Sequence, residues 1–291
     1  WVTTTPSKQA RSVPRNTFKT VTDAWNGYHS VPLRPEDRHL TTFITPWGRY
    51  RYCRNPQGFV GAGDGYNQRF DAVLSDFNRK ERCVDDTIFW DADLADHWKR
   101  TIDFLSTAGR AGIVLNPDKF QFCLREVDFA GFRISSDSVQ PLPKYLDAIR
   151  DFPTPVNITD VRSWFGLINQ VSAYAQVRPL MAPFRHLLSS KTPFQWTDEL
   201  ASAFAASKIE IVKAIERGGE IFAPMLPTCL RTDWSKEGLG YHLLQKTCRC
   251  KNVSPACCSD GWRITLAGSR FNNGAESRYA PIEGEALAIA W

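Results

Sequence analysis

Two adjacent acids, Asp85 and Asp86, stand before the apolar run Ile88-Phe89-Trp90, and a third acid, Asp23, lies upstream of them. Carboxylates brought onto one edge of a sheet repel one another by about 4 kcal/mol per close pair at an effective dielectric constant of about 20. A fold that gathers three of them therefore needs cations at that edge. The residue types predict the electrostatic outline of a two-metal site for phosphoryl transfer.

Taken alone, the acidic pair is weak evidence, because such pairs are common in surface turns. The order of the surrounding motifs adds weight to it. Asp23 ends a predicted strand, Gly27-Tyr28-His29 follows that strand, and Pro56-Gln57-Gly58-Phe59 precedes a predicted helix. The pair Asp85-Asp86 itself is predicted at the tip of a hairpin.

The elements that must position these residues follow from hydrophobic periodicity and turn residues. One helix is predicted to start at Asp64, and a second is predicted from about Leu94 to about Gly109. This order of strand, helix, hairpin, helix and strand is typical of an α+β sandwich with helices on one face of the sheet and the other face open to a ligand. Strands are predicted over residues 17–21, 43–45, 50–53, 113–115 and 127–132.

A change of composition marks a second part of the chain. Four prolines punctuate residues 141–155 and are interpreted as the exit from the first domain. Thr159 is predicted to cap a helix with an apolar stripe, and a further helix is predicted from about Asp198 to Ile215. A strand-rich unit opens at Gly218-Gly219, with strands predicted over residues 228–233, 240–244 and 262–267.

Length and composition limit the class of protein. The chain has 291 residues, is 43% hydrophobic and carries a net charge of +5, which indicates a globular protein of two domains or of one domain with an appendage. The basic first twenty residues suit a polyanion or a solvated tail equally well. No apolar run reaches membrane-spanning length and no signal peptide is recognisable, so we expect an intracellular protein without a membrane partner. A helix unfinished at Trp291 indicates a fragment of a longer polyprotein.

The ordered motifs resemble the palm of reverse transcriptases, most closely those of gypsy-type LTR retrotransposons, and the likeness covers nearly the whole chain. It implies a palm with a remnant of the fingers over 1–136, a thumb and helical connection over 137–217, and a partial RNase H-like mixed α/β domain over 218–291. Further segments recur in that family in the same order: Thr45-Pro46-Trp47-Gly48-Arg49-Tyr50, Leu115-Asn116-Pro117-Asp118-Lys119-Phe120, Phe152-Pro153-Thr154-Pro155, Trp164-Phe165-Gly166-Leu167 and Thr232-Asp233-Trp234-Ser235.

The resemblance implies roles for the palm residues. Asp23 and Asp85 would hold two Mg²⁺ ions, with Asp86 as a supporting carboxylate, to lower the pKa of a primer 3′-hydroxyl and clamp the triphosphate. Tyr28 would stack under the incoming sugar and obstruct a 2′-hydroxyl, and its alternative is an ordinary sheet aromatic. Gln57 and Gly58 would form the nucleotide-contacting turn.

Two further segments are assigned by the same resemblance. Lys119 lies close to the position of the lysine that is proposed, in polymerases, to protonate the leaving pyrophosphate. A solvated surface lysine is the simpler explanation. Phe129 and Gly131 belong to a segment that resembles the primer grip. The glycine-rich stretch Gly61–Gly65 departs from the family's usual Asn-Ala-Pro and predicts a looser turn. The helix from Thr159 would be the thumb helix, lying along the template-primer.

In the last unit, Asp233 and Glu285 would be the first two acids of an RNase H site, and Glu283 competes with Glu285 for that role. Two more acids of that site would lie beyond Trp291, so this domain is expected to be catalytically incomplete.

An insertion with four cysteines is not explained by the resemblance. Cys248, Cys250, Cys257 and Cys258 could supply a structural Zn²⁺ site. The spacing is unusual, and adjacent cysteines ligate one ion only with difficulty, so a loop of free thiols is the alternative.

The leading interpretation is an RNA-directed DNA polymerase from a retrotransposon polyprotein, with weak or absent activity in this fragment. Its expected partners are an RNA or DNA template-primer, deoxynucleoside triphosphates and the remainder of the polyprotein, in cytoplasmic particles or the nucleus. The alternative is an inactive or domesticated retroelement relic that only binds nucleic acid.

Overall fold

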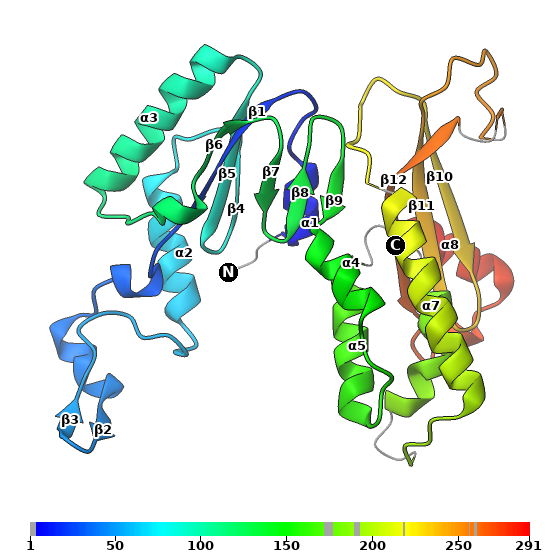
Figure 1. Cartoon of the computed structure of the whole chain (residues 1–291), viewed down its shortest axis with the longest axis horizontal. Helices are drawn as coiled ribbons and strands as arrows, with labels where there is room; N and C mark the ends of the chain where they lie inside the picture. The colour runs from blue at the N-terminus through cyan, green and yellow to red at the C-terminus, as the bar shows by residue number, and fades with distance from the viewer. Residues whose placement is uncertain (1–3, 172–176, 189–192, 218, 256, 259–260) are drawn as a thin grey trace. The chain divides into compact units, whose positions relative to one another are not determined.

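The computed structural model describes residues 4–171, 177–188, 193–217, 219–255, 257–258 and 261–291. The chain divides into two compact units, an N-terminal unit (Trp1–Ser136) and a C-terminal unit (Asp137–Trp291) (Figure 1). In the part of the chain that the structure describes, every helix is too short or too polar to cross a membrane.

The N-terminal unit is built on a four-stranded antiparallel sheet in the order β4-β5-β1-β6. Its strands are β1 (Phe18–Asp23), β4 (Lys80–Cys83), β5 (Asp86–Asp91) and β6 (Gln121–Leu124). The inner residues of β1 and β5 are buried, which explains why β5 reads as a continuous apolar run rather than as an alternating one. The register of these two strands fixes which residues meet at the end of the sheet.

Two helices pack on this sheet, α2 (Ala62–Val73) and α3 (Leu94–Arg110), and Figure 1 shows both on the same side of it. Their apolar stripes meet the sheet in one core cluster that contains Tyr66 and Phe70 of α2, Phe104 of α3 and Phe89 of β5. Asp93 caps α3, because its carboxylate accepts hydrogen bonds from the backbone N–H groups of Ala95 and Asp96. The predicted sandwich of helices on a sheet is therefore correct for this unit.

Smaller elements complete the N-terminal unit. They are α1 (Pro6–Arg11), the hairpin of β2 (Phe43–Thr45) and β3 (Gly48–Tyr50), the hairpin of β7 (Val127–Phe129) and β8 (Phe132–Ile134), and 3-10 helices over Tyr28–Ser30, Pro35–Thr41 and Pro117–Lys119. The predicted strand at 113–115 is wrong: Leu115 forms only an isolated bridge with Ala24. The strand that pairs with β1 on this side is β6, six residues further along the chain.

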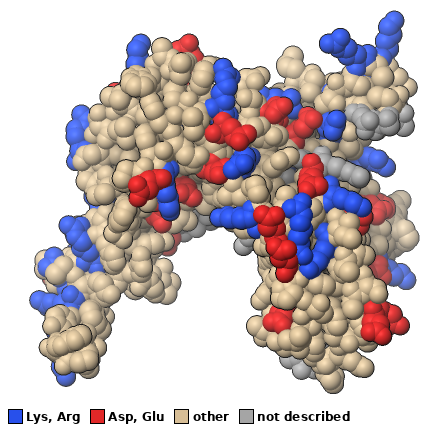
Figure 2. Space-filling model, in the orientation of Figure 1, with Lys and Arg blue, Asp and Glu red and all other residues tan. Residues whose placement is uncertain are grey.

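Helices dominate the first half of the C-terminal unit, which contains β9 (Val139–Pro141), α4 (Pro143–Arg150), α5 (Ile158–Val171), α6 (Arg178–Met181), a 3-10 helix over Ala182–Leu188, and α7 (Asp198–Arg217). Trp164 of α5 packs edge-on against Phe204 of α7 with ring centroids 4.9 Å apart. Acidic and basic side chains are interleaved over α4 and α7 (Figure 2), and they include the ion pair between Arg150 and Glu216.

The cap predicted for α5 is off by two residues. The helix begins at Ile158, so Thr159 already lies inside its first turn. The carboxamide of Asn157 caps it by accepting a hydrogen bond from the N–H of Asp160 at 3.0 Å. Asn is as good a cap as Thr, and its carbonyl reaches the same orphan N–H groups.

The second half of the C-terminal unit is an antiparallel sheet in the order β10-β11-β12, followed by a 3-10 helix over Glu276–Arg278 and by α8. Its elements are β10 (Thr228–Trp234), β11 (Gly238–Lys246), β12 (Trp262–Phe271) and α8 (Pro281–Ala290). α8 lies against β10 so closely that a β-carbon on Gly284 would come within 2.1 Å of the Trp234 indole. The predicted strands are correct, each extended by a few residues.

Candidate active site

The acids Asp23, Asp85 and Asp86, here called the acid cluster, come together at one end of the N-terminal sheet. In the register of β1 and β5, Asp23 lies directly opposite Asp86. The backbone N–H of Ala24 donates a hydrogen bond to the carbonyl of Asp85 at 2.9 Å, which holds the hairpin tip against the end of β1. The structure therefore gathers the three acids that the sequence predicted to converge, although 62 residues separate Asp23 from Asp85.

The hairpin tip that carries Asp85 has a defined backbone conformation. Val84 has a φ of 54°, in the left-handed region, as two-residue turns of the I′ and II′ classes require at their first position. The guanidinium of Arg82 donates to the Val84 carbonyl at 2.7 Å. The same guanidinium donates to Asn67 and Asp71 of α2, so it fixes the tip to that helix.

Arg82 is well placed for this role because only 8% of its side chain is exposed, and it lies over the rings of Tyr66 and Phe70. A buried guanidinium in full hydrogen-bonded contact is a rigid support. No role for Arg82 or Tyr66 in the site was predicted from the sequence. The only signal was the position of Tyr66 on the apolar face of the predicted helix, which also fits a plain core residue.

The acid cluster is electrostatically costly. Burial raises the pKa of Asp86 to about 6, and the neighbouring charge of Asp23 adds to this effect. Burial and then the charge of Asp23 also raise the pKa of Asp85. These directions are those of like charges forced together in a partly desolvated pocket.

One cation of the chain already faces the cluster. The ammonium of Lys119 lies 2.9 Å from Oδ2 of Asp23, and this hydrogen bond raises the pKa of Lys119. A short turn positions this lysine. In the turn, the Asn116 carboxamide accepts a hydrogen bond from the Asp118 N–H, and the Asn116 N–H donates to the Asp23 carbonyl. The predicted role of Lys119 near the leaving pyrophosphate stays a prediction, and the structure shows the ammonium paired with Asp23 at the acid cluster.

Gly27 makes room for the cluster. A β-carbon on this residue would lie 2.7 Å from Oδ1 of Asp85 and 2.7 Å from the Tyr66 ring. The chain segment after β1 can pass this close to the hairpin tip only because Gly27 has no side chain. Gly27 belongs to the motif Gly27-Tyr28-His29, but the sequence alone does not indicate its role.

The residues of the cluster fit a hard divalent cation. Oδ1 of Asp85 is buried and makes no hydrogen bond with any residue that the structure describes. The buried Tyr66 hydroxyl lies nearby and the charge of Asp85 reinforces burial in raising the Tyr66 pKa, but the two atoms miss hydrogen-bond geometry. Three carboxylates with an orphaned oxygen and an ammonium already drawn to them are a donor set suited to Mg²⁺.

The other predicted palm residues differ in their exposure. Tyr28 is half-buried, with its ring centroid 5.5 Å from that of Tyr66. Gln57 and Gly58 lie in an exposed turn, where Gly58 has a φ of 90°. The looser turn predicted for 61–65 is wrong, because α2 begins at Ala62 and takes in both Gly63 and Gly65. The Asn55 carboxamide ties this turn to α2 by donating to the Ala62 carbonyl at 3.0 Å.

The segment predicted as a primer grip is a tight hairpin. Ala130 and Gly131 have φ values of 47° and 93°, which is the pattern of a type I′ turn. Phe129 is only 1% exposed, so its side chain belongs to the core of the unit. A ligand could therefore meet the backbone of the hairpin tip but not the Phe129 ring.

The two acids of the C-terminal unit are arranged differently. Trp234 faces α8, so Asp233 faces the other side of β10, where it lines a cavity of about 200 Å³ together with Arg178 and Ser269. Glu285 is exposed on α8. Glu283 caps α8 by accepting from the Ala280 N–H at 2.9 Å, which leaves Glu285 as the uncommitted acid of the two. The structure thus shows Asp233 at the cavity and Glu285 at the surface of α8, the helix that packs on the same strand through Gly284 and Trp234.

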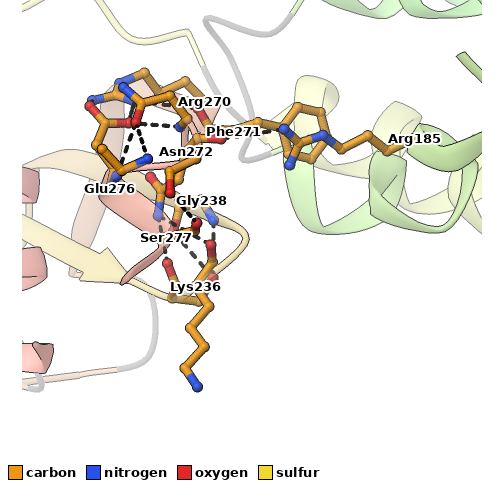
Figure 3. Close-up of polar contacts among 12 residues, drawn as sticks. Arg185, Lys236, Gly238, Arg270, Phe271, Asn272, Glu276 and Ser277 are labelled. Atoms are coloured by element: carbon orange, nitrogen blue, oxygen red, sulfur yellow. Dashed lines mark hydrogen bonds and ion pairs between the residues drawn. The ribbon is translucent and has the colours of Figure 1, made fainter. Parts of the chain in front are cut away.

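The turn after Asp233 is held by the end of β12 (Figure 3). The Asn272 carboxamide donates to the Ser235 carbonyl at 2.8 Å, and Arg270 forms a paired hydrogen bond with Glu276. Arg185 lies over the Phe271 ring at 4.5 Å. These supports position the turn between β10 and β11, and with it the end of the strand that carries Asp233.

Comparison with known proteins identifies the class first. Residues 2–134 match the family model described as "Reverse transcriptase (RNA-dependent DNA polymerase)", which covers almost all of the N-terminal unit. This part of the chain, with its acid cluster on an antiparallel sheet, belongs to the reverse transcriptase family.

The particular resemblance to gypsy-type retrotransposon polyproteins is also confirmed. The chain is 28% identical over 292 residues to the Retrovirus-related Pol polyprotein from transposon opus, and 28% identical over 296 residues to that from transposon gypsy, both of Drosophila melanogaster. Each match covers 94% of this chain. The chain spans about a quarter of these relatives, 27% and 26% of their lengths.

Solved structures share the fold. The foamy viral protease-reverse transcriptase in complex with an RNA/DNA hybrid matches with a TM-score of 0.78, at 18% sequence identity, over 97% of this chain and 37% of that chain. The same protein in complex with dsDNA matches with a TM-score of 0.77 over 100% of this chain and 59% of that chain, again at 18% identity. The predicted α+β class is confirmed.

Proposed function

We propose that this chain is the polymerase part of a retrotransposon Pol polyprotein and that it catalyses RNA-directed DNA synthesis with two Mg²⁺ ions at the acid cluster. The observation that carries the proposal is the convergence of Asp23, Asp85 and Asp86 at one sheet end. Raised carboxylate pKa values supply the reason for cations there, since gathering the acids without a counter-charge is unfavourable.

Each side chain of the site then has a task. Asp23 and Asp85 would hold the ions and Asp86 would support them, and the bound ions would acidify a primer 3′-hydroxyl and neutralise a triphosphate. Arg82 and Gly27 keep Asp85 aimed at Asp23. Lys119, already paired with Asp23, would be released toward the anionic substrate when a divalent cation takes its place.

The proposed partners are a template-primer and deoxynucleoside triphosphates. Residues 34–54, here called the basic lobe, carry five arginines against two acids, and Figure 2 shows basic side chains over the β2–β3 hairpin. Exposed aromatic residues stand beside them, including Trp47 and Tyr50. Cations interleaved with aromatic rings suit a single-stranded template, which offers both phosphates and base faces. Tyr28, Gln57 and Gly58 are the proposed nucleotide contacts.

The C-terminal sheet and α8 are proposed to be the start of an RNase H domain. The support is the order of β10, β11, β12 and α8, with Asp233 and Glu285 on neighbouring packed elements. Because two acids are only half of the four-carboxylate site that the resemblance implies, no nuclease activity is assigned to these residues alone.

A primer-extension assay on the full-length polyprotein product tests the polymerase proposal. The variant Asp85→Asn keeps the shape of the side chain and removes its charge, so we expect extension to fall by more than about 100-fold. The matched control is Asp147→Asn, an exposed acid of α4 that pairs with Arg150, with extension expected to stay near the wild-type rate. A wild-type product that binds template-primer, extends nothing and is indifferent to Asp85→Asn would instead establish the relic that only binds nucleic acid.

A further inference from the structure

The loop between β11 and β12 folds its four cysteines into one cluster. The sulfur atoms of Cys248, Cys250, Cys257 and Cys258, here called the thiol cluster, all lie within 4.8 Å of one another. The sulfur of Cys257 lies 3.4 Å from that of Cys248 and 3.9 Å from that of Cys258. The adjacent pair, expected to ligate together only with difficulty, is thus brought to the same point by the fold of the loop.

We propose that the thiol cluster is a structural Zn²⁺ site that fixes the β11–β12 loop, a function separate from polymerisation. Tetrahedral zinc with four sulfur ligands at 2.3 Å places its sulfur atoms about 3.8 Å apart. The separations in this loop bracket that value. Four thiolates and no open coordination position define the closed, structural kind of zinc site.

Gly261 packs directly against the thiol cluster. A β-carbon on Gly261 would lie 2.5 Å from the sulfur of Cys258, 2.8 Å from that of Cys248 and 3.1 Å from that of Cys257. Three thiols therefore pack on the bare α-carbon of one glycine. Gly261 does not adopt a left-handed backbone conformation. Glycine is therefore required here because a side chain would collide with the sulfur atoms.

Backbone contacts fix the cluster to the ends of the two strands. Thr247 N–H donates to the Gly261 carbonyl at 2.9 Å, which closes the base of the loop. The indole N–H of Trp262 donates to the Ser254 carbonyl at 3.0 Å, and the ammonium of Lys246 donates to the Cys250 carbonyl. The ligands on both sides of the loop are thus tied to β11 and β12 before any ion is added.

The local charge suits a zinc thiolate centre. Four thiolates and one Zn²⁺ give a net charge of −2, since four negative charges exceed two positive ones. Lys246, Arg249 and Lys251 supply cations within or next to the ligand segment. Lys246 is buried and its ammonium donates a hydrogen bond to the carbonyl of Cys250, which places a positive charge at the backbone of one ligand.

Disulfides would account for the cluster less well. Sulfur atoms in a disulfide lie about 2.05 Å apart, and all eight cysteines of the chain are free thiols in the structure. A disulfide would use two of the four thiols in each bond and would leave no reason for all four sulfur atoms to lie within 4.8 Å of one another. One tetrahedral ion uses all four equally.

The first test measures metal in the full 291-residue chain, purified under reducing conditions without chelator. We expect about one zinc per chain, and after exchange to Co²⁺ the absorption bands of a tetrahedral cobalt thiolate centre. Metal-free protein that takes up neither ion and has all eight thiols titratable would overturn the proposal. Protein with disulfides in the loop under these conditions would overturn it as well.

Variants locate the site. Cys248→Ser and Cys257→Ser are each expected to weaken zinc binding at least about tenfold in a chelator competition. Cys229→Ser is the matched control, because Cys229 is a half-buried thiol on β10 outside the cluster. Gly261→Ala should weaken zinc binding while leaving all four thiols present. Zinc binding that survives both cysteine variants unchanged would contradict this site, whereas polymerase activity is not part of the readout.

Discussion

The two acidic regions of this chain differ in what surrounds them. In the N-terminal unit, strand register and a buried arginine bring Asp23, Asp85 and Asp86 to one point. In the C-terminal unit, Asp233 lines a cavity beside β10 and Glu285 is exposed on α8, and the turn after Asp233 is held by Asn272 and by the pair of Arg270 and Glu276. An acidic motif therefore becomes a site only where the fold supplies both a common face and buried supports, and the following variants probe that difference.

The largest effect is expected at Gly27. In Gly27→Ala the new β-carbon meets Asp85 and Tyr66 at 2.7 Å, so we expect a loss of about 2 kcal/mol in the free energy of unfolding and a strong loss of primer extension. Gly63→Ala is the same substitution in open space within α2, and it should stabilise the protein by about 0.5 to 1 kcal/mol. Denaturant unfolding compares them, and equal effects of the two variants would contradict the close approach at Gly27.

The next effect is expected at Arg82. Arg82→Met keeps the length of the side chain but removes the hydrogen bonds to Asn67, Asp71 and the Val84 carbonyl, at a cost of about 2 kcal/mol. Arg133→Met breaks an exposed pair with Asp128 and should cost less than about 0.5 kcal/mol. If chemical denaturation gave the two variants the same stability, Arg82 would not be the support of the hairpin tip.

Lys19 makes the stability of the N-terminal unit depend on pH. It is fully buried, donating to the carbonyls of Thr17 and Arg125, and burial lowers its pKa from 10.5 to about 8. Between pH 8 and pH 10 the unfolded chain holds this proton and the folded chain does not, so stability rises with pH. Relative to Lys19→Met, the wild type should gain up to about 2 kcal/mol over this window.

Parallel unfolding curves of wild type and Lys19→Met at pH 8 and pH 10 measure this gain. The raised pKa of Tyr66 acts in the opposite direction above pH 10, but it is present in both proteins and cancels in the difference. A difference that stays constant with pH would show that Lys19 keeps its ordinary pKa.

A smaller effect is expected at Asn272 in the C-terminal unit. Asn272→Ala removes the hydrogen bond to the Ser235 carbonyl at 2.8 Å but also removes a buried carboxamide oxygen that lacks a partner among the described residues, so we expect a cost of about 1 kcal/mol. Ser277→Ala, which loses an exposed contact with the Gly274 carbonyl, should be close to neutral. Thermal unfolding of both variants measures the loss of stability. A larger loss in Ser277→Ala than in Asn272→Ala would contradict the prediction.

The smallest effect is expected at Glu276. Hydrogen bonds from Arg270 and from the Asn273 backbone lower the pKa of this acid to about 2. The stabilisation is fully present above the unfolded pKa of about 4.5 and is lost as pH falls toward 2, because the folded state then has to take up the proton. Glu276→Gln should lower the Tm by about 2 °C or less at pH 6, and the two proteins should converge near pH 2. A Tm gap that widens in acid would refute the pairing with Arg270.

The sequence was sufficient where the signal was local or carried by a family motif. The acidic pair, the apolar stripes of α2, α3 and α5 and the strands of the last sheet each lie within one short window, and all were placed correctly. The strand at 113–115 failed for a physical reason: an apolar run of three residues beside Gly112 looks the same whether it pairs over its length or touches β1 at a single bridge.

The supports of the site could not be predicted, because they act between distant segments. Arg82 reaches back to Asn67 and Asp71, and Gly27 matters only because Asp85 arrives beside it after 58 further residues. Periodicity gives each segment's buried face but not the partner that fills it. The prediction for 61–65 failed for a local reason. Glycines usually signal a turn, but α2 includes Gly63 and Gly65.

The φ of 54° at Val84 also has a consequence for engineering this protein. A β-branched residue in the left-handed region is held there against its own preference, at a cost of about 1 to 3 kcal/mol. Glycine at this position would remove that cost and make the folded protein more stable. The same change would free the peptide that orients the next two side chains, so a variant stabilised at this residue is expected to lose rate in the proposed polymerase reaction.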